Sequence, residues 1–104
     1  MALEFKNVKE KLETTPLTNE ELEIISEVER FIDDKIESNF DNRPLYFNLS
    51  IVQFQLGLNG RILIIKQTRR NLMYKELENR YLKAGWKVSI DDDQGNQDWI
   101  LKGE

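Results

Sequence analysis

One segment near the N-terminus carries a complete set of helix-start signals. Thr18 is followed three residues later by Glu21, which is the spacing of a capping box. Leu17 before the cap and Leu22 after it have the spacing of a hydrophobic staple. Apolar residues then recur every three or four positions, which predicts an amphipathic helix from Thr18 to about Ser38. The opposite face is acidic and includes Glu20, Glu23, Glu27 and Asp34.

The next segment fits two interpretations. Residues 45–51 alternate between apolar and polar side chains, which is the period of a β-strand. The alternation changes phase at residues 51–52 and then continues to Leu56, and a β-bulge in one long strand would explain this. In the alternative, Ser50 and Gln53 form a second capping box, and a short helix replaces the second half of the strand.

The middle of the chain contains the signals of a hairpin. Asn59–Gly60 is a favoured pair for a type I′ turn, and residues 62–65 are apolar and β-branched, which predicts a short buried strand. Polar residues then separate this strand from a second helix, expected over residues 69–83 with Thr68 as its N-cap. The alternative is one long helix over residues 61–84.

The C-terminal part predicts a helix stop and two more strands. Gly85 follows the second helix where a residue of left-handed conformation commonly ends helices. Residues 86–90 alternate as a strand, residues 91–97 form an acidic loop, and residues 99–101 return as the last strand. The expected order is α-β-β-α-β-β. It describes one α+β domain over residues 17–104, with two helices packed on a small, mostly antiparallel sheet.

Residues 1–16 form an N-terminal arm outside that domain. Phe5, Val8 and Leu12 have the spacing of one helix face, and a free helix of this length is only marginally stable in water. The arm therefore needs a surface to lie on. Either it packs on its own domain, or it docks onto a partner protein or a second copy of the chain, which would give a homo-oligomer.

Composition narrows the classes of function. The chain of 104 residues has no cysteine, which excludes thiol catalysis, disulfide scaffolds and thiolate zinc sites. It also has no histidine, the most common general base. The densest acidic cluster is Asp91, Asp92, Asp93 and Asp98, but Gly95 falls where a calcium loop needs an oxygen ligand. We therefore expect no enzymatic activity, no metal and no cofactor.

The sequence also indicates in which cellular compartment the protein is found. No apolar run approaches the length of a membrane span, and no secretory signal opens the chain. We expect a soluble cytoplasmic protein without a membrane partner.

The net charge of -4 conceals a strong segregation of charge along the chain. Residues 61–87, here called the basic block, hold eight Lys and Arg against two Glu. On a helix, Lys66, Arg70 and Tyr74 would share one face that could follow a phosphate backbone. The candidate binding residues of the block are Arg61, Lys66, Arg69, Arg70, Tyr74 and Lys75. Three partners are open for it: the acidic helix of the same chain, another protein, or nucleic acid.

The stretch Tyr81-Leu82-Lys83-Ala84-Gly85-Trp86-Lys87-Val88 is followed by the acidic loop and an apolar strand. This ending resembles the C-terminal helix-Gly-Trp-strand ending of small uncharacterised proteins of large tailed bacteriophages, over residues 68–101. In those proteins Arg-Asp-Gly often follows the acidic loop, where this chain has Gln94-Gly95-Asn96. The resemblance implies a phage accessory or virion component, located in the host cytoplasm or the virion, and it transfers no functional residue.

Together these features predict a non-enzymatic protein-interaction module. It would be a phage accessory, assembly or host-factor-binding protein whose partner is another phage or host protein. The alternative is a nucleic-acid-binding domain that uses the basic block. The two hypotheses differ in salt dependence, because counterion release makes binding to nucleic acid weaken steeply as salt rises.

Overall fold

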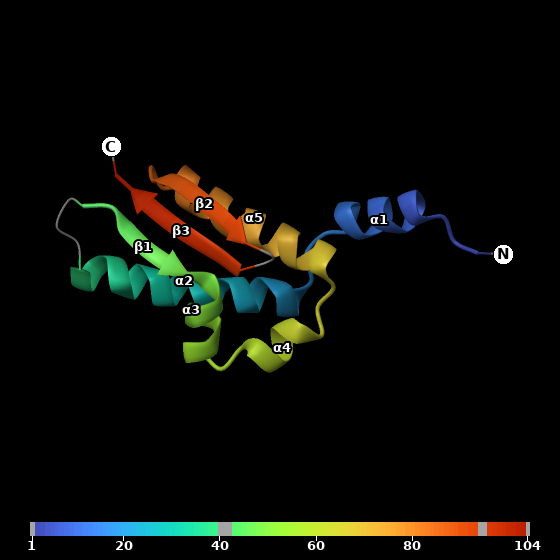
Figure 1. The fold of residues 1–104 in the computed structure, drawn as a ribbon, viewed down its shortest axis with the longest axis horizontal. Coiled ribbons are helices and arrows are strands. Elements are labelled where there is room, and N and C mark those ends of the chain that lie inside the picture. Colours follow the sequence, from blue (N-terminus) through green and yellow to red (C-terminus); the bar gives the residue numbers. More distant parts are fainter. Residues whose placement is uncertain (1, 40–42, 94–95, 104) are drawn as a thin grey trace.

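The computed structural model describes residues 2–39, 43–93 and 96–103, and within them the chain forms five helices and three strands (Figure 1). The architecture is α+β, as predicted. No helix in these ranges is both long enough and apolar enough to cross a membrane. In chain order the elements are α1 (Phe5–Thr14), α2 (Asn19–Asn39), β1 (Leu45–Asn48), α3 (Leu49–Gln55), α4 (Asn59–Leu63), α5 (Gln67–Lys83), β2 (Lys87–Asp93) and β3 (Asn96–Lys102).

The three strands form one antiparallel sheet in the order β1-β3-β2. Because β3 is central, Trp99 lies opposite Phe47 of β1 and Ile90 of β2. The pairing of β1 with β3 joins segments that are far apart in the sequence. It therefore ties the middle of the chain to its C-terminal end.

Helices α2 and α5 lie behind the sheet in Figure 1 and enclose the core with it. Trp99 and Leu101 of β3 are fully buried in the same cluster as Ile32 of α2 and Leu77 of α5. Tyr46 of β1 is instead 72% exposed. One buried and one solvated face is the usual arrangement of a small antiparallel sheet.

Local signals set the ends of α2 and α5. The N–H of Thr18 donates to Oε1 of Glu21 at 2.8 Å, and the N–H of Glu21 donates to Oγ1 of Thr18 at 3.1 Å, so the predicted capping box is confirmed. Gly85 follows α5 with a φ of 97°. The N–H of Trp86 donates to the carbonyl oxygen of Tyr81 at 3.0 Å, which completes a Schellman motif.

The long strand with a bulge is wrong, and the short helix is correct in its place. β1 ends at Asn48 and α3 follows directly. Asn48, rather than Ser50, is the N-cap, because its side-chain oxygen accepts from the N–H of Ile51 at 3.0 Å. Leu49 and Val52 are both buried, and their spacing of three is that of a helix facing a core.

The hairpin at Asn59–Gly60 and the strand over residues 62–65 are also wrong. This part of the chain forms α4. Ile62 is buried, whereas Leu63 at the end of the helix and Ile64 at its C-cap are 76% and 79% exposed. Only one side of the apolar run meets the core, so the run does not need the two buried faces of an inner strand. The order within the described ranges is therefore α-α-β-α-α-α-β-β rather than α-β-β-α-β-β.

The start of α5 also differs from prediction. The helix begins at Gln67, and Lys66 rather than Thr68 occupies the N-cap position. Lys66 has extended backbone angles, and this break separates α5 from α4. The single helix over residues 61–84 is therefore wrong.

The acidic loop is shorter than predicted. β2 continues to Asp93 and β3 begins at Asn96, while Gln94 and Gly95 lie outside the described residues. Asp91 stands opposite Asp98 in the register, a like-charge pair that disfavours strand pairing. The Nδ2 of Asn48 donates to Oδ1 of Asp98 at 2.7 Å and offsets part of this repulsion.

Helix α1 projects from the rest of the molecule (Figure 1). None of its residues is buried. The longest extent of the molecule is 58 Å, against 28 Å and 26 Å in the other two directions. The arm is therefore helical as its spacing predicts, but it covers little of its own domain.

Candidate functional site

The fold divides the basic block between different surroundings. Arg61 faces α2, Arg69 is buried beside the N-terminal arm, and Arg70 and Tyr74 line a polar hollow near the sheet. Lys66 precedes α5 as its N-cap and lines a different hollow, so it does not join Arg70 and Tyr74 as the helical spacing suggests.

Arg61 lies over the acidic face of α2. Its guanidinium nitrogens are 3.7 Å, 3.8 Å and 3.6 Å from carboxylate oxygens of Glu20, Glu23 and Glu27. The Arg61 side chain is 35% exposed, so pairs at these distances contribute about 1 kcal/mol or less each. The chain thus neutralises part of its own acidic face. Asp34, the fourth predicted acidic residue, is exposed further along α2.

Arg69 uses all five of its N–H donors within the chain. Its Nε and Nη2 donate to the two carboxylate oxygens of Glu21 at 3.1 Å and 2.6 Å. Its Nη1 donates to the carbonyl oxygens of Leu12 and Thr15 at 2.7 Å and 2.5 Å. Its Nη2 also donates to the carbonyl oxygen of Pro16 at 2.9 Å. Arg69 therefore clamps the end of α1 and the following linker to the start of α2 and α5.

The contacts of Arg69 with Glu21 and with the carbonyl groups of the arm are here called the clamp. In it, both Arg69 and Glu21 stay charged. The hydrogen bond from Arg69 lowers the pKa of Glu21, and burial opposes this only in part. The same hydrogen bond raises the pKa of Arg69. Both side chains are less than 10% exposed, at 9% and 8%. Arg69 thus offers neither a surface nor a free charge to a partner.

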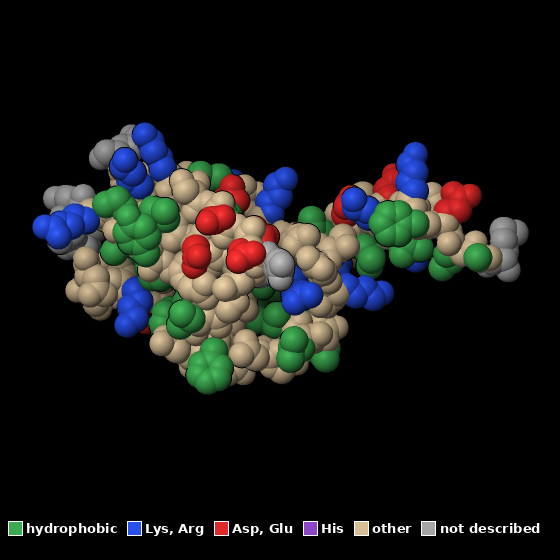
Figure 2. All heavy atoms as spheres, in the orientation of Figure 1, with side chains coloured by type: hydrophobic (Ala, Val, Ile, Leu, Met, Phe, Trp, Pro, Cys, Tyr) green, Lys and Arg blue, Asp and Glu red, His purple; other side chains and the backbone are tan. Residues whose placement is uncertain are grey.

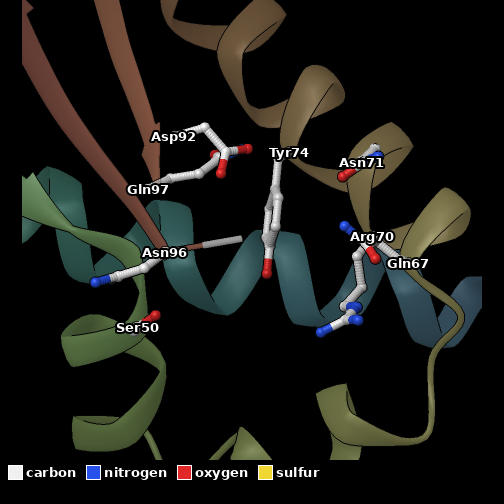
Figure 3. Close-up of a pocket in the computed structure, with 8 residues that line it drawn as sticks. All are labelled: Ser50, Gln67, Arg70, Asn71, Tyr74, Asp92, Asn96 and Gln97. Atoms are coloured by element: carbon white, nitrogen blue, oxygen red, sulfur yellow. The ribbon is translucent and has the colours of Figure 1, made fainter. Parts of the chain in front are cut away.

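Arg70 lies in the polar hollow between α5, the start of α3 and the β2–β3 hairpin (Figure 3). The hollow has a volume of about 270 Å³. Figure 3 shows the ring of Tyr74 standing in its middle, with Arg70 on one side and Asp92 and Gln97 on the other. The lining residues are Ser50, Gln67, Arg70, Asn71, Tyr74, Asp92, Asn96 and Gln97.

Two walls of the polar hollow are held by hydrogen bonds from outside it. The buried amide of Gln53 donates from Nε2 to the hydroxyl of Tyr74 at 2.9 Å. The Nδ2 of Asn48 donates to Oδ1 of Asn96 at 2.9 Å. Tyr74 and Asn96 are therefore oriented before any ligand arrives.

Arg70 makes no hydrogen bond or ion pair with any described residue. Its Nε is shielded from solvent. Among the described residues, it is the buried side-chain nitrogen or oxygen that has no hydrogen-bond partner. Other arginines of the basic block have carboxylate partners: Arg80, for example, lies 3.2 Å from Glu29 and 3.3 Å from Glu76.

A second hollow, the arm groove, lies between α1 and the start of α5. It has a volume of about 520 Å³, and the apolar side chains of Leu3, Val8 and Leu12 line it together with Lys66. Lys75, the remaining candidate of the basic block, is exposed and lines a separate hollow with Thr14 to Leu17.

The acidic residues of the hairpin do not gather into a metal site. Figure 2 shows acidic side chains together over β2 and β3. Within residues 2–39, 43–93 and 96–103, no group of three or more acidic side chains is arranged to hold a metal ion. The predicted cluster therefore remains a charged surface.

Sequence reasoning paired Arg70 with Tyr74 through their spacing of four, but it missed the residues opposite them. The sequence predicts Ser50 in a strand or in a second capping box, and it predicts Asn96 and Gln97 in a loop. Asn48 had a usable signal, since asparagine is a favoured N-cap before an apolar run. No local pattern reports that these segments meet α5.

No protein-family model, curated protein or solved structure matches this chain.

Proposed function

We propose that the protein is a non-enzymatic interaction module that binds another protein through α1 and the arm groove. The observation that carries the proposal is the apolar face of α1, which projects without cover from its own domain. Leu3 and Phe5 are 85% and 82% exposed, and Val8 and Leu12 line the arm groove. Exposed apolar side chains gathered in one place are typical of protein-binding surfaces.

The clamp supports this proposal by fixing the root of α1. Arg69 holds the carbonyl groups of Leu12, Thr15 and Pro16, so the end of the helix has a defined position. A helix presented in a fixed direction loses less conformational entropy on binding than a free arm. The partner that fits is an amphipathic helix or an apolar groove, because the charges of α1 itself balance: three Lys stand against two Glu within it and Glu4 before it.

The pairing of charges favours a protein over nucleic acid as the partner. Arg61, Arg69 and Arg80 are engaged with carboxylates of α2, and Arg80 also with one of α5. This leaves fewer cations for a phosphate backbone than the eight of the basic block, on a chain whose net charge is -4. Binding to nucleic acid depends on the number of phosphates that cations neutralise.

The resemblance of residues 68–101 to phage proteins extends the proposal. On that ground we place the module among accessory, assembly or host-factor-binding proteins of a tailed phage, acting in the host cytoplasm or in the virion. A second copy of the chain is one possible partner of α1, which would make the arm the contact of a homo-oligomer.

Two matched double variants test the proposal. Phe5→Gln with Val8→Gln makes the apolar face polar, whereas Lys6→Gln with Glu10→Gln changes the polar face by the same residue type and leaves the net charge unchanged. Each is compared with the wild type in affinity capture from host lysate treated with nuclease, and in sedimentation velocity.

A partner or a dimer that the first variant loses and the second keeps is the expected result. Equal behaviour of the two variants would contradict the role of the apolar face. A complex that disappears on nuclease treatment would instead support the nucleic-acid alternative.

A further inference from the structure

We propose that the polar hollow is a binding site for a phosphoryl group of a small phosphorylated ligand, with Arg70 holding its charge. This site is separate from α1 and the arm groove. The inference rests on the state of Arg70, on the hydrogen-bond donors left free around it, and on the shape of the hollow.

Arg70 is the arginine of the basic block that has no partner among the described residues. Arg61, Arg69 and Arg80 each face a carboxylate, whereas Arg70 has neither an acid nor a hydrogen-bond partner among the described residues. Its Nε is shielded from water as well. The Arg70 side chain lines the polar hollow, and charge-assisted hydrogen bonds from a guanidinium to a phosphoryl group are strong, so an oxyanion there would supply the missing partner.

Further donors face the same space. The hydroxyl of Tyr74 already accepts from Gln53 at 2.9 Å, so its own proton is free to donate. The side chain of Asn96 points away from the Tyr74 ring in Figure 3 and accepts from Asn48 at 2.9 Å, so it contributes to the wall of the hollow rather than a donor. The Ser50 hydroxyl adds one more donor from the start of α3. A phosphoryl group, with three strong acceptor oxygens, fits this number of donors better than a carboxylate with two.

The two sides of the polar hollow differ in charge. Figure 3 shows Asp92 and Gln97 on the other side of the Tyr74 ring from Arg70. Asp92 accepts from Nε2 of Gln97 at 3.1 Å, so this end presents acceptors and negative charge. The charge of a ligand therefore belongs beside Arg70, and its uncharged remainder lies toward Asp92. A volume of about 270 Å³ suits a small molecule.

The start of α5 supports the same sign of charge. Its first turn contains no acidic residue, and no side chain caps it. The positive end of a helix attracts an anion, so the helix adds to the attraction of Arg70.

The test is a titration with inorganic phosphate, followed through the Nε–H signals of the arginines by nuclear magnetic resonance. Ionic strength is held constant with chloride. The wild type should show a saturable shift of one arginine signal, and that signal should be absent from Arg70→Gln. The substitution should weaken phosphate binding by about tenfold or more, because a hydrogen-bonded charge pair is lost. Lys75→Gln, which removes an exposed cation from the same helix, should change the affinity by less than about twofold.

A second variant leaves Arg70 in place. Ser50 is exposed and lines the hollow across the Tyr74 ring from Arg70 (Figure 3), so Ser50→Asp adds a negative charge to the hollow and should weaken phosphate binding without disturbing the fold. Phosphate binding that Ser50→Asp leaves unchanged, or that is weakened equally by Arg70→Gln and Lys75→Gln, overturns the proposal. So does acetate binding as tightly as phosphate, since the site would then recognise carboxylates.

Discussion

Arg69 and Arg70 are adjacent in the sequence and in α5, yet their surroundings are opposite. Arg69 is buried, and each of its five N–H donors has an acceptor within the chain. Arg70 lines the polar hollow and has no partner among the described residues. The same side chain therefore serves as a structural clamp at one position and remains available for a ligand at the next.

The difference shows that a count of positive charges does not measure a binding surface. The eight cations of the basic block suggest a partner outside the chain. The fold gives several of them partners inside it, on α2, on α5 and in the arm. What remains for function is set by which cations the chain leaves unpaired, and Arg70 is the most enclosed of these.

The largest effect expected from this comparison is on stability. Arg69→Met leaves the N–H of Thr18 as the remaining donor to the buried carboxylate of Glu21, and it removes the arginine donors from three carbonyl groups of the arm. Breaking one side of a buried ion pair costs about 3–5 kcal/mol. Urea unfolding should show this loss, and limited proteolysis should show cleavage between α1 and α2. A loss as small as that of Arg70→Met would mean that the clamp contributes little.

Acid should weaken the clamp selectively. The pKa of Glu21 lies below its ordinary value of 4.5, because Arg69 stabilises the charged form. Its contribution is therefore present above the ordinary pKa and is lost as the pH falls through the lowered pKa. The difference in unfolding free energy between wild type and Glu21→Gln should be constant above about pH 5 and should shrink below it. A difference independent of pH down to the acid transition would contradict the ionised pair.

The sequence predicts the two long helices and the final hairpin because their signals are local. The capping box at Thr18 and the stop at Gly85 act within a few residues, so each can be recognised without the rest of the fold. The prediction fails over residues 49–65, because a short apolar run fits both the helical period and the strand period. Burial in the core then decides which of the two forms. Leu49, Val52 and Ile62 meet the core from helices that no local pattern distinguishes from strands.

In the candidate site, too, contacts within one helix can be predicted from the sequence, whereas contacts between distant elements cannot. The spacing of Arg70 and Tyr74 places them together correctly, since both are on one helix. The partner of Arg69 lies on α2, and the residues facing Arg70 lie on α3 and the hairpin. These contacts depend on how the helices and the sheet assemble, so the sequence allowed both a paired and a free basic block.

Arg61 offers an intermediate case. Its three carboxylate neighbours lie at 3.6 Å or more, and its side chain is 35% exposed. Arg61→Met should therefore lower the unfolding free energy by about 0–1 kcal/mol, and the loss should decrease in high salt because solvent-exposed pairs are screened. Urea unfolding at low and high salt measures both. A loss that stays the same in high salt would show that Arg61 acts through packing of its aliphatic stem rather than its charge.

The smallest effect on stability is expected at Arg70. Arg70→Met removes a guanidinium that satisfies no acceptor among the described residues, and it also removes a shielded N–H without a partner there. Replacing an unsatisfied buried polar group with an apolar side chain of similar length is neutral or slightly stabilising. The unfolding free energy should thus stay within about 0.5 kcal/mol of the wild type or rise, and Lys75→Met provides the matched control on the same helix. A loss of several kcal/mol would place Arg70 with Arg69 as a structural residue, and the contrast between the two arginines would then disappear.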